Sequence, residues 1–533
     1  MDESDVKDVE MSTEKKADHG EERQEPEYPS LAKVMIIISA LYLAVFLVAL
    51  DQTIIGVAIP KITDQFKSIS DIAWYGSAYF LTSTALQPSY GRIYKVFSVK
   101  WGFLAAIVIF EIGSLICAVA PSSTVLIVGR AIAGIGVAGI FSGAMVIISM
   151  TVPLPKRPLV FGMFGMVARL LMGYPGDGAF ISISPIGGLS IAVILFTLRL
   201  PDRNEFSGTS IATRLRQLDI IGASLLIPAI VCLLLALQWG GNQYPWNNSK
   251  IIGLFVGFGL LVLLFIASQL YLREKATLPP HILKRRTVAF SALFALFFGG
   301  GFFLLVYYVP IFFQSVKNSS AMKSGIQLLP LMLATVVSSV VVGGLVTAAG
   351  YYTPFLIGST AIAAIGTGLV TTFDVDISTS KWIGYQILVG AGVGAGFQIP
   401  MTAVQTVLQP EDIPVGTAIV MFFQTLGGAL FLAVGQSVFQ NGLIDGIHKY
   451  APDVNPTVIV GAGATEMRHT LTTLGQLDQL DGVIRAYMAG LQDAYRVSLA
   501  LMVVAFVSSC FFEFKSVKKA DQERKGELAV PAL

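Results

Sequence analysis

Long runs of apolar residues dominate this sequence, each about as long as a helix needs to cross a lipid bilayer. The hydrocarbon layer is about 30 Å thick, so a spanning helix takes about 20 mainly apolar residues, and its backbone polar groups must be paired within the chain. The sequence therefore predicts an all-α polytopic membrane protein with about fourteen spans. The fourteen runs are residues 34–59, 73–91, 101–120, 123–148, 159–173, 180–199, 219–239, 251–271, 288–313, 325–349, 353–372, 382–406, 414–437 and 495–514.

The composition excludes several other classes of protein. Of the 533 residues, 54% are hydrophobic and 13% are charged, whereas a soluble domain carries about 25% charged residues. The formal net charge of +2 leaves no basic surplus to neutralise phosphates, so no nucleic-acid partner is expected. Cys117, Cys232 and Cys510 lie far apart, which predicts neither a disulfide framework nor a metal site. No catalytic or nucleotide-binding motif stands in a supporting context, so neither an enzyme nor a resident cofactor is expected.

The distribution of charge predicts the orientation in the membrane. Residues 1–30 hold eleven acidic and four basic residues with no apolar core, which is typical of a disordered cytosolic arm rather than a secretory signal. With this arm inside, nineteen Lys and Arg fall in inner connections and the C-terminal tail, and six fall in outer connections. This bias places both termini in the cytosol. Two glycosylation sequons, at Asn247 and Asn318, then lie outside.

Among the ionisable residues inside predicted spans, three are candidates for function, because an unpaired charge at membrane depth is costly. Asp51 lies nine residues before Pro60, and Arg130 lies nine residues after Pro121, so an Asp51–Arg130 pair at one depth is expected. Glu111 lies midway along the third span. Desolvation there favours the neutral carboxyl, so Asp51 and Glu111 are candidate proton carriers, against the alternative that each is simply satisfied by a neighbouring polar group.

Several motifs resemble those of one transporter family. They are the inner loop Gly91–Lys100 with its cations, the glycine-rich stripe Val128–Gly139, the segment Leu50–Pro60, and two segments of the second half, Gln398–Pro400 and Phe422–Gly428. Together with fourteen spans, they resemble the major facilitator superfamily, and within it the fungal 14-spanning drug:proton antiporters that export toxins and secondary metabolites. Taken alone, the cations of the loop could be ordinary topology signals, and the glycines could serve close helix packing.

The resemblance implies an organisation and a mechanism. It implies a major facilitator fold of two six-helix bundles with two additional central helices, a monomer that works by alternating access, and export driven by a proton gradient with no cofactor. Arg92 and Lys95, with Gly91, would belong to a gating loop, and Arg130 with Asp51 resembles the family's apparatus for coupling protons to transport. Glu111 joins these two as a candidate only from its position in the third span. The expected segments are a tail at 1–33, a first bundle at 34–200, two linking helices with cytosolic loops at 201–286, a second bundle at 287–514 containing an external loop at 438–494, and a tail at 515–533.

The fifth span departs from the family pattern. The family carries a G-P-x-x-G-G stretch followed by an outer W-R-W segment, and residues 165–188 lack both. One choice of codons for Trp-Arg-Trp-Cys-Phe-Tyr-Ile-Asn-Leu-Pro, read from the second base, encodes Gly-Asp-Gly-Ala-Phe-Ile-Ser-Ile-Ser, which stands at 176–184. We therefore hypothesise a local frame error or aberrant splice in residues 168–184. If the altered chain is the one made, loss of transport is expected.

The substrate is expected to be a small hydrophobic or amphipathic molecule, such as a mycotoxin or another secondary metabolite, or a drug. Such transport needs a large apolar cavity with a few adaptable polar groups. Proton-coupled uptake of a nutrient or siderophore is the alternative function. The cell membrane is the expected location, with a vacuolar or vesicle membrane as the alternative. Candidate cavity residues are Gln52, Gln238, Trp239, Tyr307, Tyr308, Gln398, Gln405, Phe422, Phe423 and Gln424.

Overall fold

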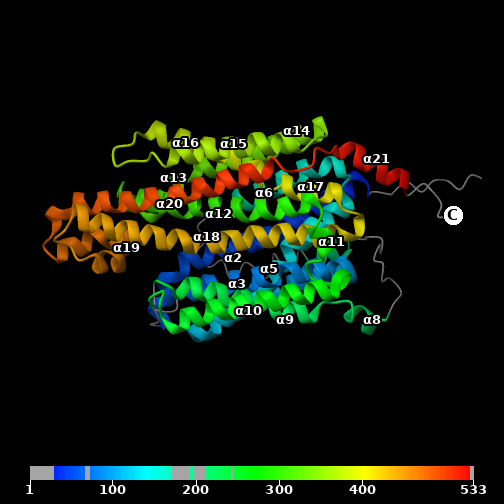
Figure 1. Ribbon diagram of the computed structural model, residues 1–533, viewed down its shortest axis with the longest axis horizontal. Helices are drawn as coiled ribbons and strands as arrows, with labels where there is room; N and C mark the ends of the chain where they lie inside the picture. The colour runs from blue at the N-terminus through cyan, green and yellow to red at the C-terminus, as the bar shows by residue number, and fades with distance from the viewer. Residues whose placement is uncertain (1–28, 67–71, 171–190, 197–209, 242–243, 528–533) are drawn as a thin grey trace, which may run out of the picture.

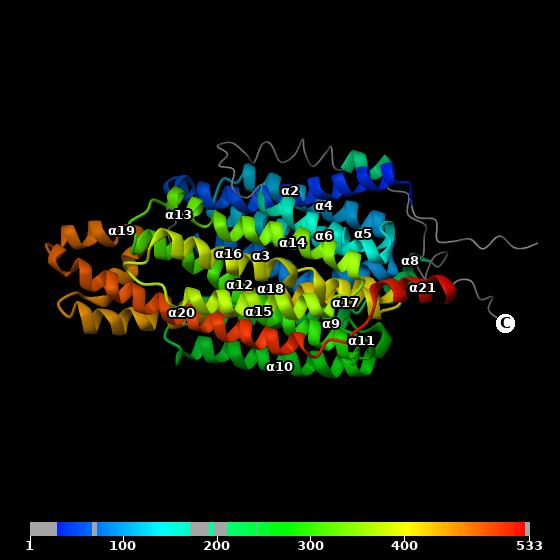
Figure 2. The same ribbon diagram turned by 90° about the horizontal axis from the view of Figure 1, so that it is seen from above.

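The computed structural model describes residues 29–66, 72–170, 191–196, 210–241 and 244–527. Its helices run close to parallel along one long axis, with the short helix α19 at one end and α21 at the other (Figure 1). A second view shows the same elongated arrangement (Figure 2). Within these residues the only β-pairing is two isolated bridges, so the predicted all-α class is confirmed.

The helices follow the apolar runs of the sequence. The first half contains α2 (Leu31–Phe66), α3 (Ile72–Val96), α4 (Val99–Ala118), α5 (Ser123–Thr151), η2 (Leu154–Lys156) and α6 (Arg157–Leu170). The middle contains α8 (Ile211–Leu215), α9 (Ile220–Trp239), α10 (Ser249–Leu272) and α11 (Pro280–Leu283). The second half contains α12 (Arg286–Ser315), α13 (Ala321–Gln327), α14 (Leu329–Ala349), α15 (Thr353–Val370), α16 (Thr379–Gly396), α17 (Ile399–Val407), η5 (Pro410–Asp412), α18 (Ile413–Tyr450), α19 (Pro456–Thr473), α20 (Leu480–Ser509) and α21 (Val517–Glu527).

Eleven helices in the described part of the chain are long and apolar enough to cross a membrane. The remaining three predicted spans differ. The second corresponds to α3, which is long enough but less apolar, and the fifth corresponds to α6, which has 14 residues. Only residues 191–196 of the sixth are described, and they are helical. The count of fourteen spans therefore stays a prediction, and the altered stretch at 171–184 lies outside the described residues.

Three helices differ in extent from the predicted spans, each for a local reason. The helix of the second span, predicted to end at residue 91, continues to Val96, because nothing after Gly91 breaks it before the Ser98 turn. The span predicted at 382–406 falls within one candidate membrane span, Thr379–Val407, which divides into α16 and α17 because Pro400 stands in the first turn of α17 and cannot continue the ladder of α16. Helices α18 and α20 both continue into the predicted external loop, where α19 joins them.

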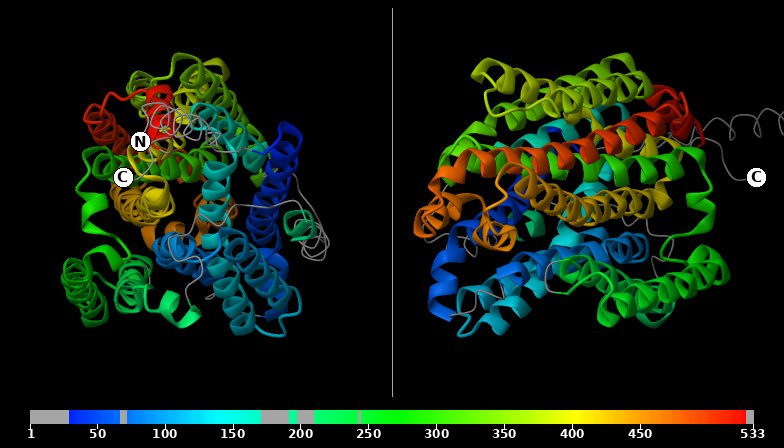
Figure 3. Two further views of the ribbon diagram at one scale, coloured as in Figure 1. Left: turned by 90° about the vertical axis from the view of Figure 1, so that its right-hand side faces the viewer. Right: turned by 60° about the vertical axis from the view of Figure 1, so that its left-hand side comes forward.

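The helices pack as two groups with separate hydrophobic cores. In the first half α5 packs against α3 and α4, and in the second half α12, α18 and α20 pack on one another, as do α14, α15 and α16. The two groups meet along α3 with α18 and along α6 with α14. The α9–α10 pair lies at the edge of the assembly, with α9 against α3 and α18 (Figure 3).

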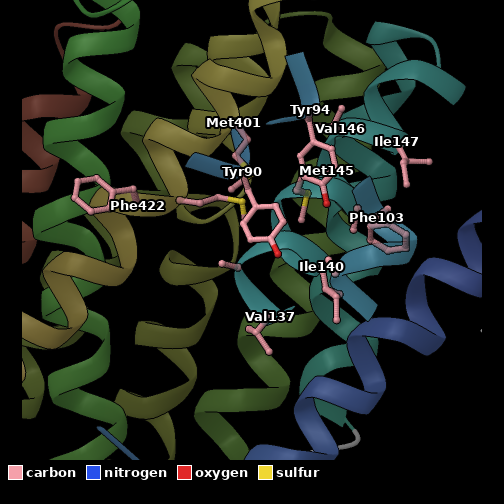
Figure 4. Close-up of a cluster of buried hydrophobic side chains, with 14 of the residues drawn as sticks. Tyr90, Tyr94, Phe103, Val137, Ile140, Met145, Val146, Ile147, Met401 and Phe422 are labelled. Atoms are coloured by element: carbon pink, nitrogen blue, oxygen red, sulfur yellow. The ribbon is translucent and has the colours of Figure 1, made fainter. Parts of the chain in front are cut away.

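The two groups are packed together at the end that carries α21. We call this the basic end, because Lys95, Arg157, Arg285 and Arg524 lie there. The core of the first group continues into the second half at this end. Met401 and Phe422 join the cluster that holds Tyr90 and Tyr94 (Figure 4). Positive-inside sorting predicts that the basic end faces the cytosol.

A buried carboxylate ties the α9–α10 pair to the segment that leads to α12. Asp219 caps α9 by accepting from the backbone N–H of Gly222 at 2.5 Å. It also accepts from Nε2 of Gln269 at 2.7 Å, and from the N–H and hydroxyl of Thr277 at 2.8 and 2.9 Å. Gln269 in turn accepts from the N–H of Leu278. The cluster fixes both ends of the connection between α10 and α11.

Replacing Asp219 with alanine is expected to lower the stability of the protein by about 3 kcal/mol, because buried donors lose a charged acceptor. Thermal unfolding of the purified protein measures the effect. The matched control is Asn455→Ala, which removes an N-cap of α19 on an exposed surface. The control is expected to cost only about 1 kcal/mol, because water can satisfy the freed N–H. Equal losses in the two variants would contradict the role given to the buried cluster.

Candidate functional site

A buried ion pair joins α2 to α5. Oδ2 of Asp51 lies 2.5 Å from Nη1 of Arg130, and the two side chains are 0% and 2% exposed. The pair that the sequence predicts is therefore present. Because bare charges are strongly disfavoured at membrane depth, each residue stabilises the ionised form of the other.

Helix α3 completes the surroundings of Arg130. Its Nε donates to the carbonyl of Tyr75 at 2.9 Å, and its guanidinium lies 4.2 Å from the ring centroid of Tyr79. These contacts are possible because α3 approaches α5 at Gly134, where any Cβ would collide with the carbonyl of Tyr79. The glycine stripe thus has a packing role that also positions α3 against the arginine.

Arg130 and Asp51 differ in how fully their polar atoms are satisfied. Nε of Arg130 bonds Tyr75 and its Nη1 bonds Asp51, whereas Oδ1 of Asp51 is buried and accepts no hydrogen bond from a described residue. One carboxylate oxygen is therefore held by the arginine, and the other has no hydrogen-bond donor among the described residues.

Glu111, the other candidate acid, is half-buried on α4. The ion pair of Arg130 is with Asp51. Of the three residues predicted to couple protons, the structure therefore joins Asp51 and Arg130 in an ion pair, and the part of Glu111 stays a prediction.

The predicted gating residues lie on a helix rather than in a loop. Gly91, Arg92 and Lys95 occupy the last turns of α3, so the loop prediction is wrong for them. Arg92 is buried and donates from Nε to the carbonyl of Gln217 at 3.1 Å. Nζ of Lys95 lies 2.7 Å from Oδ1 of Asp412, at the start of α18. The helix thus holds Arg92 against the segment before α9 and Lys95 against the start of α18 in the second half.

Sequence reasoning missed Asp412 and the bundle-bridging role of Arg157. Arg157, at the start of α6, donates to the carbonyls of Ser149 and Val152 at the end of α5, and from Nη1 to Oε1 of Gln405 at 3.2 Å. Asp412 also lies 3.7 Å from Nε2 of His281. The available signal for Asp412 was the Glu411-Asp412 pair between two apolar runs, on the side where positive-inside sorting places cations.

The structure places two of the predicted cavity glutamines at contacts between the halves. Gln405, on α17, is fully buried and pairs with Arg157. Gln398 donates to the hydroxyl of Ser339, which in turn donates to the carbonyl of Gly162 on α6 at 3.4 Å.

The remaining cavity candidates are dispersed. Tyr308 is buried against Phe439, Tyr307 is 55% exposed, and Trp239 packs edge-on against Trp74 and Tyr244. The side chain of Gln52 lies outside the described residues. The described candidates lie on several helices, and a cavity shared by them stays a prediction. Gln238 lies on α9. Phe422, Phe423 and Gln424 lie on α18, which packs against α3.

Both predicted glycosylation acceptors are exposed between helices. Asn247 stands in the turn before α10, and Asn318, with a φ of 51°, stands between α12 and α13. Their exposure is compatible with modification, and their occupancy stays a prediction.

Comparisons with known proteins agree with this architecture. The family model described as Major Facilitator Superfamily matches residues 41–432. An MFS-type efflux pump of Arthroderma benhamiae, MFS1, is 48% identical over 502 residues, covering 91% of this chain and 92% of that protein. The efflux pump aflT of Aspergillus parasiticus is 44% identical over 504 residues, covering 91% and 96%.

Solved structures show the same fold at low sequence identity. The human organic anion transporter MFSD10 superposes with a TM-score of 0.60 at 13% identity, covering 90% of this chain and all of that one. The proton:xylose symporter XylE gives a TM-score of 0.56 at 12% identity, covering 92% and 99%. The family model, the full-length relatives and the shared fold together show that this chain belongs to the Major Facilitator Superfamily of membrane transporters.

Proposed function

We propose that this transporter is a proton-coupled exporter of small hydrophobic or amphipathic molecules, such as a toxin or another secondary metabolite, at the cell membrane. The observation that carries the proposal is the buried Asp51–Arg130 pair, whose second carboxylate oxygen accepts no hydrogen bond from a described residue. Both relatives described above are named efflux pumps, which supports export as the direction of transport. No cofactor is needed, because the proton gradient supplies the free energy.

The pair offers a direct way to couple a proton to a change of conformation. A proton on Asp51 removes the charge that holds Arg130 to α2, while Arg130 keeps its carbonyl and ring contacts with α3. Protonation therefore weakens the tie between α2 and α5 and leaves the tie between α3 and α5 in place. We propose that protonation from the outer side follows substrate release and favours return to the state open at the basic end.

The basic end supplies the second part of the proposed cycle. In this structure it is closed by Lys95 with Asp412 and by Arg157 with Gln405, and each pair joins the two halves. Opening the basic end to the cytosol requires both pairs to separate. In alternating access, these contacts form when the basic end closes and are lost when it opens, as Asp51 gains or loses a proton.

The test is flux in liposomes that contain the purified protein. With an acidic lumen and a neutral exterior, molecules whose basic end faces outward should move rhodamine 6G into the lumen. A protonophore should abolish this accumulation, and protein-free liposomes provide the background.

The reverse gradient separates the alternatives. Accumulation that requires an acidic exterior and neutral lumen would mean symport and would favour uptake of a nutrient or siderophore. Absence of proton-dependent flux under both gradients, in protein that unfolds cooperatively, would contradict the proposal and favour a transport-inactive chain, as the missing motif of the fifth span predicts.

A further inference from the structure

The C-terminal helix α21 lies across the contact between the two halves at the basic end. It packs against η2, which belongs to the first half, and against α17, which belongs to the second. We propose that α21, called here the strap, is a conformational device that holds the basic end closed and must disengage from one half when that end opens. The proposal concerns closure alone, and it depends neither on the transported compound nor on the direction of transport.

The strap is fixed to the second half at its N-terminal end. The N–H of Val517 donates to the carbonyl of Gly350 at 2.8 Å, next to the bridge between Tyr351 and Ser516. Nζ of Lys518 donates to the carbonyl of Ala348 at 2.6 Å, at the end of α14. Val517 itself is 1% exposed in the core of the second half. This end of the strap therefore moves with the second half.

The other end of the strap reaches the bundle-bridging glutamine. Nη2 of Arg524 donates to the carbonyl of Gln405 at 2.6 Å and to that of Leu408 at 2.5 Å, which are free acceptors at the end of α17. A cation at a helix C-terminus is also favoured by the helix dipole. Because Gln405 receives Arg157 of the first half on its side chain and Arg524 on its backbone, the strap stabilises the position from which Gln405 bridges the halves.

The contact with η2 gives the strap its effect on opening. Helix η2 ends at Lys156 and α6 begins at the next residue, Arg157. Movement of the first half away from α17 therefore also moves η2 away from the strap. Opening must therefore break the contact between the strap and η2 or pull Arg524 from the end of α17. Either event makes the open state less favourable while the strap is engaged.

The experiment measures opening directly, by spin-label distances in the full chain without any transported compound. Lys156 and Glu411 are exposed at the basic end, one on each half, and both are replaced with labelled cysteine in a Cys232→Ser, Cys510→Ser background. Arg524→Gln is expected to raise the population of the longer distance by roughly tenfold, within the usual range for coupled sites. A chain that stops after Ser516 should raise it at least as much.

The matched control is Lys519→Gln. Lys519 is exposed on the same helix, and among the described residues its side chain makes no hydrogen bond. It should leave the distance distribution unchanged. The strap proposal fails if Arg524→Gln and the shortened chain both keep the parental distribution, or if Lys519→Gln shifts it equally. A failure of rhodamine 6G transport would bear on the proposed function and would leave this distance measurement intact.

Discussion

Asp51→Asn protein is expected to lose proton-driven accumulation of rhodamine 6G and to fall to the level of protein-free liposomes. Asparagine keeps the shape of the side chain and can still accept a hydrogen bond from Arg130, but it can neither take up nor release a proton. It also leaves the guanidinium of Arg130 buried without a counter-charge. Removing one partner of a buried pair costs about 3–5 kcal/mol, so thermal unfolding must be measured alongside transport.

A double variant separates the loss of the proton from the loss of stability. Asp51→Asn with Arg130→Gln removes both charges, so it should recover most of the stability that Asp51→Asn loses. It should still show no proton-driven flux. Glu111→Gln tests the other candidate acid, and because this change leaves both charges of the Asp51–Arg130 ion pair in place, it should retain flux. Undiminished proton-driven flux in Asp51→Asn protein would remove Asp51 from the coupling mechanism.

The second large effect is expected at Gly91, where α3 meets α18. A Cβ at this position would lie 2.5 Å from Cβ of Ala418 and 3.1 Å from the carbonyl oxygen of Pro414. Backbone atoms cannot move aside as a flexible side chain can, so Gly91→Ala should destabilise the closed basic end by about 1–3 kcal/mol. The ratio of closed to open protein should then fall by about 5- to 150-fold, measured with the Lys156–Glu411 label pair.

Gly76→Ala is the matched control on the same helix. Nothing lies within 4 Å of a Cβ built at Gly76, so this variant carries the same change in helix propensity without a contact between halves. It should keep the parental distance distribution. If Gly91→Ala behaves like Gly76→Ala, the closeness of α3 and α18 does not limit closure of the basic end.

The Asp51–Arg130 contact could be predicted because a proline lies nine residues from each residue. Pro121 lies between α4 and α5, whereas α2 continues past Pro60 to Phe66, so Pro60 indicates the depth of Asp51 without ending its helix. The equal spacing of nine residues still predicts the two charges at one level. The high cost of an unpaired charge then allows few arrangements. Most helices could be predicted from the apolar runs for a similar reason, since the thickness of the bilayer sets the length of a spanning helix.

Contacts between the two halves could not be predicted in the same way. Lys95 and Asp412 are separated by 317 positions, and nothing in the sequence relates the depth of α3 in the membrane to that of α18. Gln405 was expected in a cavity because it is a polar residue in an apolar run, yet that pattern is equally typical of a buried hydrogen-bonding residue. Aromatic residues such as Tyr308 are ambiguous for the same reason, because packing and ligand contact favour the same side chains.

Helix α18 has the proportions of a lever. It is one continuous helix of 38 residues, about 57 Å long at 1.5 Å per residue. Its first turns lie against Gly91, whereas its last turns lie beside α19 at the opposite end of the molecule. A tilt of about 5° around the Gly91 contact displaces the far end by about 5 Å over this length. A shift too small to break a helix at one surface therefore becomes, at the other, a displacement wider than a methyl group.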